Sequence, residues 1–258
     1  MKNIHISNID SLINSIHAVG QVVTGAKFII NTSGLTCLFK SQNARVKLTN
    51  FNTTCEDEIS FCINDFSKFL NYMKLIKSNE QVTNFDLQFQ KTYIGYKGNL
   101  VEFKYTLCRE EIIAQNIDQE IITNLDIECV FETDYETVRN ILSNKNLISD
   151  DLQSITYRVE QDKIKTKMIF AHLSDVQNPS TNAIKLYFGK VLQGNMLNNI
   201  YINTERLQLA TILKGENIVI TKANKNVIII DLEERNEQTD ELITQIKIYV
   251  SLLRGPEW

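Results

Sequence analysis

The order of expected strands and helices in the first half of the chain recurs in the second half. A short alternating strand at Ile4–Ile6 precedes a helix with apolar residues at helical spacing, and Cys129–Phe131 precedes a similar helix. Further along, the strand Ile59–Ile63 leads into a second helix, and Ile200–Asn203 leads into its counterpart. An internal duplication explains this order, so we expect two similar domains.

The first half also contains a meander of three expected strands, Lys27–Ile30, Leu35–Phe39 and Arg45–Phe51, whose first pair is joined by a turn ending at Gly34. We expect Asn8 or Ser7 to cap the first helix and Asn64 to cap the second. The apolar stripe of the second helix is Phe66, Phe69, Leu70, Met73 and Ile76. With only two prolines in 258 residues, the chain is free to form many ladder hydrogen bonds. An α+β fold rich in strands follows.

The expected strands near 85–90, 93–96 and 101–107 end the first half. The stretch that follows, at about 108–124, shows no clean hydrophobic period and is expected to be a surface linker. We therefore expect an N-terminal domain at 1–107, a linker at 108–125 and a C-terminal domain at 126–258.

Motifs for catalysis are missing from the sequence. No G-x-G-x-x-G, G-x-x-x-x-G-K-[ST], G-x-S-x-G or H-E-x-x-H occurs, so the common phosphate loops and nucleophile elbows are not encoded. The three histidines, His5, His17 and His172, lack ligand spacing, and the five cysteines form no C-x-x-C pair. We expect no enzymatic activity, no metal site, no cofactor, and reduced thiols packed in the interior.

The charge and hydropathy patterns restrict where such a protein can act. The net charge of −4 argues against a protein that coats nucleic acid over its whole surface, although a ring can combine an acidic exterior with a basic lining. No apolar run approaches the roughly 18 to 20 residues of a membrane helix, and no signal-peptide pattern follows Met1. We expect an intracellular, cytoplasmic protein that does not contact a membrane.

Five segments resemble the sliding clamps of DNA replication, the family of PCNA and the bacteriophage clamps. They are Ala26–Leu35, Ser41–Val46, Asp126–Phe131, Asn182–Leu186 and Ile246–Val250, in the family's order and at about its spacing. The resemblance implies two similar β-rich domains, each with two helices, and a ring whose hole is lined by the helices. It also implies a homo-oligomer, a trimer in which six domains close the ring.

The resemblance further implies the function of a processivity factor that encircles double-stranded DNA without reading its sequence and tethers the replicative DNA polymerase to it. A clamp loader is the other expected partner. The composition, rich in Asn, Ile and Lys, is typical of AT-rich genomes and fits a bacteriophage or a low-GC organism; in a bacteriophage the protein would act in the host cytoplasm.

The expected lining helices carry basic residues on the faces opposite their apolar stripes. The candidate DNA-binding residues are Lys68, Lys74, Lys77, Arg139, Lys145, Arg206 and Lys214. Glu136 and Glu205 dilute this charge, and the first helix has no lysine, unlike the helix that the family usually places there. Any amphipathic helix exposes lysines to water. The charge of one helix alone therefore does not distinguish a DNA-binding face from an ordinary solvent-exposed face.

The resemblance also assigns a subunit interface and a pocket for a partner peptide. The interface joins the strands that contain Val101, Phe103 and Tyr105 in one subunit and Ile184, Leu186 and Phe188 in the next. The pocket consists of Leu38, Val46, Ile112, Ile113, Tyr249, Val250 and Leu252. The family's proline-containing C-terminal strand ends here as Ser251–Arg254, and the linker is several residues longer than the resemblance implies.

Two other functions remain open at this point. One is a structural, virion-type protein built from duplicated β-rich domains, which would need no loader. The other is a monomeric viral processivity factor, which would bind DNA without forming a ring. The size of the purified chain in solution separates these three possibilities.

Overall fold

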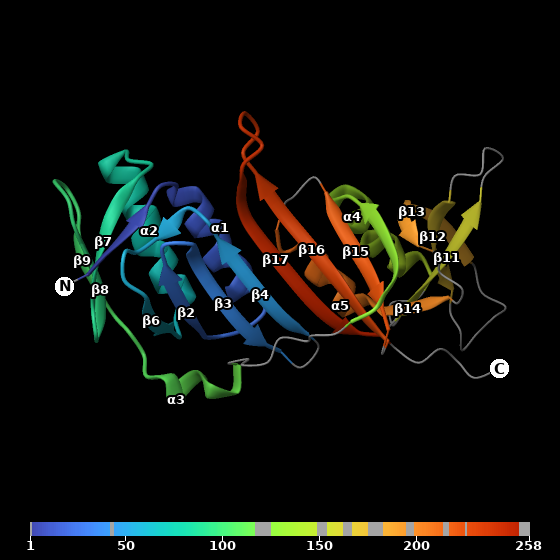
Figure 1. The fold of residues 1–258 in the computed structure, drawn as a ribbon, viewed down its shortest axis with the longest axis horizontal. Coiled ribbons are helices and arrows are strands. Elements are labelled where there is room, and N and C mark those ends of the chain that lie inside the picture. The colour runs from blue at the N-terminus through green and yellow to red at the C-terminus, as the bar shows by residue number, and fades with distance from the viewer. Residues whose placement is uncertain are drawn as a thin grey trace. The chain divides into compact units, whose positions relative to one another are not determined.

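The computed structural model describes residues 2–41, 44–116, 125–148, 154–161, 167–174, 183–194, 199–213, 217–224 and 226–252. Its contacts divide the chain into two units, Met1–Ile121 with Glu234–Ile246, and Ile122–Glu233 with Lys247–Trp258. Both units combine antiparallel strands with helices (Figure 1), as the expected α+β class requires. Within the described residues, no helix is both long enough and apolar enough to cross a membrane.

One sheet of the first unit has five antiparallel strands. Their order is β5 (Thr53–Thr54), β1 (Lys2–Ile6), β7 (Phe85–Gln90), β8 (Tyr93–Lys97) and β9 (Glu102–Thr106). Each strand pairs with its neighbours in this order, and β9 lies at one edge. No other described strand pairs with the outer side of β9, so this side offers unpaired backbone groups.

The other strands of this unit form the expected meander and its neighbour. Their order is β6 (Ile59–Ile63), β2 (Ala26–Asn31), β3 (Gly34–Lys40) and β4 (Arg45–Asn50). Gly34 begins β3 with a φ of 132°, and a Cβ there would lie 2.5 Å from the carbonyl oxygen of Asn50, so the turn requires glycine. The start of β17 (Leu242–Ser251) lies beside β4, where the backbone N–H of Phe51 donates to the carbonyl of Ile243 at 2.9 Å.

Two helices, α1 (Ile9–Gly20) and α2 (Phe66–Glu80), lie side by side in the first unit (Figure 1). Asn8 caps α1 as expected, accepting from the backbone N–H of Ser11 at 3.1 Å. The cap of α2 is Asp65 and not the expected Asn64, because the Asp65 carboxylate reaches the N–H of Lys68 at 2.9 Å. All five residues of the expected apolar stripe of α2 are buried.

A buried polar network ties α1 to the strands beneath it. The Asn50 amide donates to the Ser11 hydroxyl at 2.5 Å and to the Ser15 hydroxyl at 2.8 Å. The Thr244 hydroxyl lies 3.5 Å from the same amide nitrogen. Because these four side chains are at most 2% exposed, each hydrogen bond offsets a desolvation cost, and the network holds α1, β4 and the start of β17 in one arrangement.

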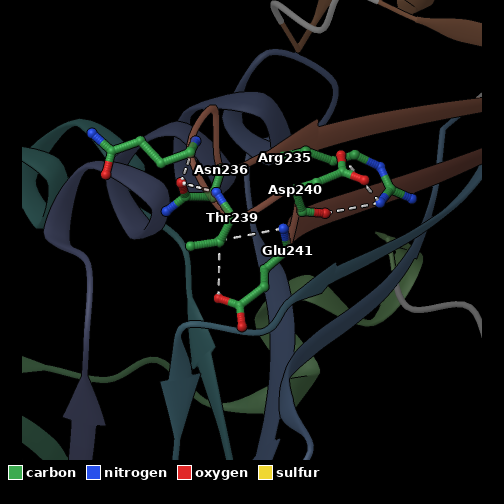
Figure 2. A network of polar contacts seen from close by, with 6 residues as sticks. Arg235, Asn236, Thr239, Asp240 and Glu241 are labelled. Atoms are coloured by element: carbon green, nitrogen blue, oxygen red, sulfur yellow. Dashed lines mark hydrogen bonds and ion pairs between the residues drawn. The ribbon is translucent and has the colours of Figure 1, made fainter.

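The hairpin between β16 (Val227–Arg235) and β17 is closed by its own polar side chains (Figure 2). The Asn236 side-chain oxygen accepts from the backbone N–H groups of Gln238 at 2.8 Å and Thr239 at 3.1 Å. Arg235 donates to the carbonyl of Asp240 at 3.0 Å, and Asp240 adopts a φ of 56°. These local bonds replace ladder bonds at the tip, so the turn is ordered by its own polar groups.

The second unit is built mainly from one run of antiparallel strands. Their order is β14 (Ile200–Asn203), β11 (Ser154–Gln161), β12 (Lys167–Ser174), β13 (Ala183–Gly194), β10 (Ile127–Thr133), β15 (Ile218–Ala223) and β16. Helices α4 (Tyr135–Asn144) and α5 (Thr204–Gln208) contact each other and continue into the 3₁₀ turns η2 (Lys145–Leu147) and η3 (Leu209–Thr211). On their inner faces the apolar residues Val138, Ile141, Leu207, Ala210 and Leu213 are all buried, whereas Leu142 is half-buried.

The expected linker begins with a short helix that packs on the first unit. Helix α3 (Glu110–Ile113) contacts β2 and β6 and continues into the turn η1 (Ala114–Asn116). Ile113 is buried against Gly25, and the Lys27 ammonium pairs with the Glu110 carboxylate at 2.8 Å. A four-residue helix barely exceeds one turn, so it leaves no hydrophobic period in the sequence.

Candidate nucleic-acid interface

The exposed face of α2 is basic and carries small polar groups together with one exposed leucine, Leu75. Lys68 and Lys74 project from it into solvent, beside exposed Ser67 and Asn71. The sequence has no acidic residue from 66 to 79, so no carboxylate within this stretch competes for these two ammonium groups. Both lysines are therefore available to contact a phosphate backbone.

Lys77, the third expected cation of this helix, already has a partner. Its ammonium lies 2.5 Å from the Asp10 carboxylate in the first turn of α1. Both side chains are about half exposed, so the ion pair adds little to stability, but it removes one positive charge from the exposed face. Because the two residues are 67 positions apart, the sequence alone did not reveal the pairing.

The basic residues expected on the second unit differ in how free they are. Arg139 is exposed on α4, and Lys145 is half-buried in η2. The Arg206 guanidinium on α5 donates to the carbonyl of Ser251, near the end of β17, so part of its donor capacity is used within the chain. Lys214 lies outside the described residues.

The open edge of β9 exposes alternate backbone groups. The N–H of Gly98 donates to the carbonyl of Val101 at 2.9 Å, and the N–H of Leu107 donates to the carbonyl of Thr92 at 2.9 Å. In an antiparallel pair of strands, residue pairs that are hydrogen-bonded to each other alternate with pairs that are not. The two bonds therefore identify which residues of β9 direct their backbone groups toward β8 and which direct them away. The residues whose N–H and C=O groups point away from β8, toward the open edge, are Glu102, Lys104 and Thr106.

The residues expected at this side of the subunit interface lie on the inner face of the strand. Val101, Phe103 and Tyr105 are 6%, 9% and 3% exposed. Phe103 stacks on Tyr72 of α2 with ring centroids 4.6 Å apart, and burial raises the pKa of the Tyr105 hydroxyl to about 12. A partner strand would therefore bond to the backbone of Glu102, Lys104 and Thr106. The side chains of Val101, Phe103 and Tyr105 instead pack β9 against the interior of its own unit.

The expected second edge lies on β13. Strand β10 pairs only with the end of β13, from Lys190 to Gly194, whereas β12 pairs with the preceding part, from Ala183 to Lys190. No described strand pairs with the other side of Ala183–Tyr187. Of the expected interface residues, Ile184 and Leu186 are half-buried on this segment, and Phe188 is fully buried.

The residues of the expected partner-peptide pocket fall into two classes of exposure. In the first unit, Ile112 is 59% exposed on α3 and Leu38 is half-buried on β3, whereas Val46 and Ile113 belong to the core. In the second unit, Tyr249 and Leu252 are half-buried and Val250 is in the core. The side chains that can reach a ligand are Leu38, Ile112, Tyr249 and Leu252.

Comparison with known proteins identifies the fold. No protein-family model and no curated protein matches the sequence. Among solved structures, the chain is similar to PCNA from Entamoeba histolytica, with a TM-score of 0.74 and 10% identity over 98% of this chain and 99% of that chain. It is also similar to A. fulgidus PCNA, in a structure with the C-terminal region of FEN-1 bound, with a TM-score of 0.73 and 14% identity over the full length of both chains. The chain has the sliding-clamp fold, as the sequence resemblance implied.

Proposed function

We propose that this chain is one subunit of a DNA sliding clamp, a protein without enzymatic activity that encircles duplex DNA and tethers a replicative polymerase. The observation that supports this most strongly is that the structural likeness to two PCNA chains spans nearly all of this chain and of both others. Its place of action would be the cytoplasm of a bacterium or of a phage-infected host. The domains are proposed to be 1–107 and 126–258, joined by the linker at 108–125.

The proposed contact with DNA is weak and independent of the DNA sequence. Lys68 and Lys74 on α2 and Arg139 on α4 supply exposed positive charge to phosphates, while the protein as a whole carries a net charge of −4. Contacts to phosphate oxygens carry no sequence information, so they allow sliding, and a closed ring supplies the long residence that such contacts cannot. Lys77 contributes less than the sequence suggested because it pairs with Asp10.

The proposed assembly is a homotrimer in which β9 of one subunit pairs with the Ala183–Tyr187 segment of the next. Two open strand edges on one chain support this arrangement, since each leaves backbone N–H and C=O groups without a strand partner among the described residues. Pairing between two different edges is head-to-tail. Such contacts close into a ring when the rotation that relates neighbouring subunits divides a full turn evenly. Three subunits bring six domains into the ring.

The proposed partners are a DNA polymerase and a clamp loader, each bound through a short peptide. The A. fulgidus PCNA structure contains the C-terminal region of FEN-1, so a clamp of this fold accepts a peptide from a partner. In this chain we assign the contact to Leu38 and Ile112 and to Tyr249 and Leu252. Tyr249 suits a site that is apolar inside and polar at its rim, because it has both a ring and a hydroxyl.

Tethering is tested by the combined substitutions Tyr249→Ala and Leu252→Ala. The wild-type chain should lengthen the products of its cognate polymerase on a primed template and bind the polymerase's C-terminal peptide in a calorimetric titration. The double variant should lose about 2 kcal/mol or more of peptide binding, roughly thirtyfold in affinity, because buried aromatic anchors dominate such contacts.

Leu192→Ala is the matched control, since it truncates a leucine that is 49% exposed on β13 and outside the assigned contact. It should leave peptide affinity unchanged. Unaltered peptide binding by the double variant would place the contact elsewhere on the chain. A wild-type chain that does not change polymerase products at all would contradict the proposed function.

A further inference from the structure

Helix α2 supports the edge strand β9 along its whole length. Near the start of the helix, the Tyr105 hydroxyl donates to the carbonyl of Asp65 at 3.2 Å, and the Tyr105 ring meets Phe69 edge-on at 5.2 Å. In the middle, Phe103 and Tyr72 stack within 7° of parallel. Strand and helix therefore run in opposite directions with their side chains packed together. The beginning of β9 lies at the C-terminal end of the helix.

At the C-terminal end of α2, one carboxylate binds the turn that leads into β9. Glu80, the last residue of α2, accepts from the backbone N–H of Leu100 at 2.7 Å and from that of Val101 at 2.8 Å. The backbone N–H of Leu100 holds the pKa of the Glu80 carboxyl below its usual range, because hydrogen bonds to a carboxylate favour its ionised form. At neutral pH the carboxylate is charged, and charge-assisted bonds of this kind are about twice as strong as neutral ones.

The turn is shaped to admit this carboxylate. A Cβ on Gly98 would lie 2.4 Å from Glu80 Oε1 and 2.5 Å from the Tyr96 hydroxyl, so only glycine leaves room for the contact. Leu100, one of the two residues anchored by Glu80, has a side chain that is 75% exposed and gains little from packing. Besides the backbone bond from Gly98 to Val101 and the buried Val101 side chain, the turn is therefore held by Glu80.

We propose that Glu80 is a positioning residue for subunit assembly, which fixes the start of β9 so that its open edge meets the neighbouring subunit in register. This inference rests on the proposed function, because it takes β9 as one partner of the subunit interface. An edge held in one conformation loses little entropy when it pairs, whereas a frayed edge must first be ordered. Glu80 touches no partner itself and acts through the backbone of Leu100 and Val101.

The test compares variants by the concentration at which the oligomer dissociates, measured by mass photometry. Glu80→Ala removes the acceptor and should raise the dissociation constant about tenfold or more. Glu80→Gln keeps an oxygen that accepts both N–H bonds and should restore assembly to within about threefold of wild type. Glu237→Ala, at an exposed carboxylate in the tip of the β16–β17 hairpin, is the control and should assemble as wild type.

Gly98→Ala displaces the carboxylate while leaving Glu80 in place, and it should weaken assembly in the same direction as Glu80→Ala. Hydrogen exchange should show faster exchange at the amides of Leu100 and Val101 in both variants, with circular dichroism unchanged. A wild-type chain that is monomeric would contradict the proposed assembly itself. A wild-type oligomer with a Glu80→Ala variant that dissociates at the same concentration would overturn only the role of Glu80, as would a Glu80→Gln variant as weak as Glu80→Ala.

Discussion

Replacing Lys104 by proline should convert the assembled protein into monomers. The Lys104 N–H points to the open edge of β9 and takes no part in the β8–β9 ladder, so proline removes a donor from the proposed subunit contact without breaking a bond inside the subunit. The lost bond and the bulk of the ring should cost about 2 to 3 kcal/mol per interface, about a hundredfold in dissociation constant. Light scattering should then report the subunit mass of 29.7 kDa in place of a mass three times larger.

The control for this experiment is Lys104→Ala. It keeps the backbone N–H and loses only the side chain, whose ammonium lies 3.9 Å from the centre of the Tyr93 ring. This contact is exposed and contributes under about 1 kcal/mol, so the alanine variant should stay assembled. A proline variant that keeps the wild-type mass, or an alanine variant that dissociates as completely, would exclude β9 as an assembly edge.

Reversing the two free charges on α2 should abolish binding to linear DNA at physiological salt, because linear DNA gives a ring no topological hold and leaves only the phosphate contacts. Lys68→Glu with Lys74→Glu replaces two phosphate-binding groups in every subunit by two repelling ones. The slope of the logarithm of the binding constant against the logarithm of salt concentration should become shallower by about 1 for each lysine that contacts a phosphate. Both side chains are exposed, so the melting temperature should change little.

Two comparisons make this result specific to the helix face. Lys40→Glu with Lys91→Glu changes the net charge by the same amount at exposed positions outside the helices, and it should leave binding to linear DNA near the wild-type level. Lys77→Ala alone should have a smaller effect than Lys68→Ala, because Lys77 is already paired with Asp10. Equal losses from the control pair would show that binding to linear DNA follows net charge and not the face of α2.

The regular elements of this fold were predictable where the hydrophobic period is uninterrupted. Strands β6, β7 and β14 begin and end at the expected residues, and the apolar stripe of α2 is buried as its spacing predicts. Strand β11 (Ser154–Gln161) was missed although Ile155, Tyr157 and Val159 alternate along it, which is the signal that identifies it in retrospect. The α2 cap was assigned one residue too early because Asn64 and Asp65 are both good caps and only the hydrogen bond distinguishes them.

The candidate site was predictable in kind and less so in detail. Period and residue type identify the basic face of α2, but the ion pair between Lys77 and Asp10 depends on how α1 and α2 pack, which no local pattern encodes. The same holds for Glu80, whose partners lie about 20 residues ahead in a turn. Strand alternation could have shown that Phe103 and Tyr105 face the interior, because Glu102, Lys104 and Thr106 are the polar members of the strand.

The most direct test of the proposed clamp is whether its hold on DNA depends on the topology of the DNA. Dilute, dissociated subunits would be concentrated in the presence of a nicked circular plasmid so that rings close around it, and the complex would be passed through a sizing column in about 1 M salt, where screening acts over roughly 3 Å. A clamp should stay with the circle in this salt and leave when one restriction cut makes the plasmid linear. Release from the uncut circle in high salt, or retention on the cut plasmid, would contradict the account.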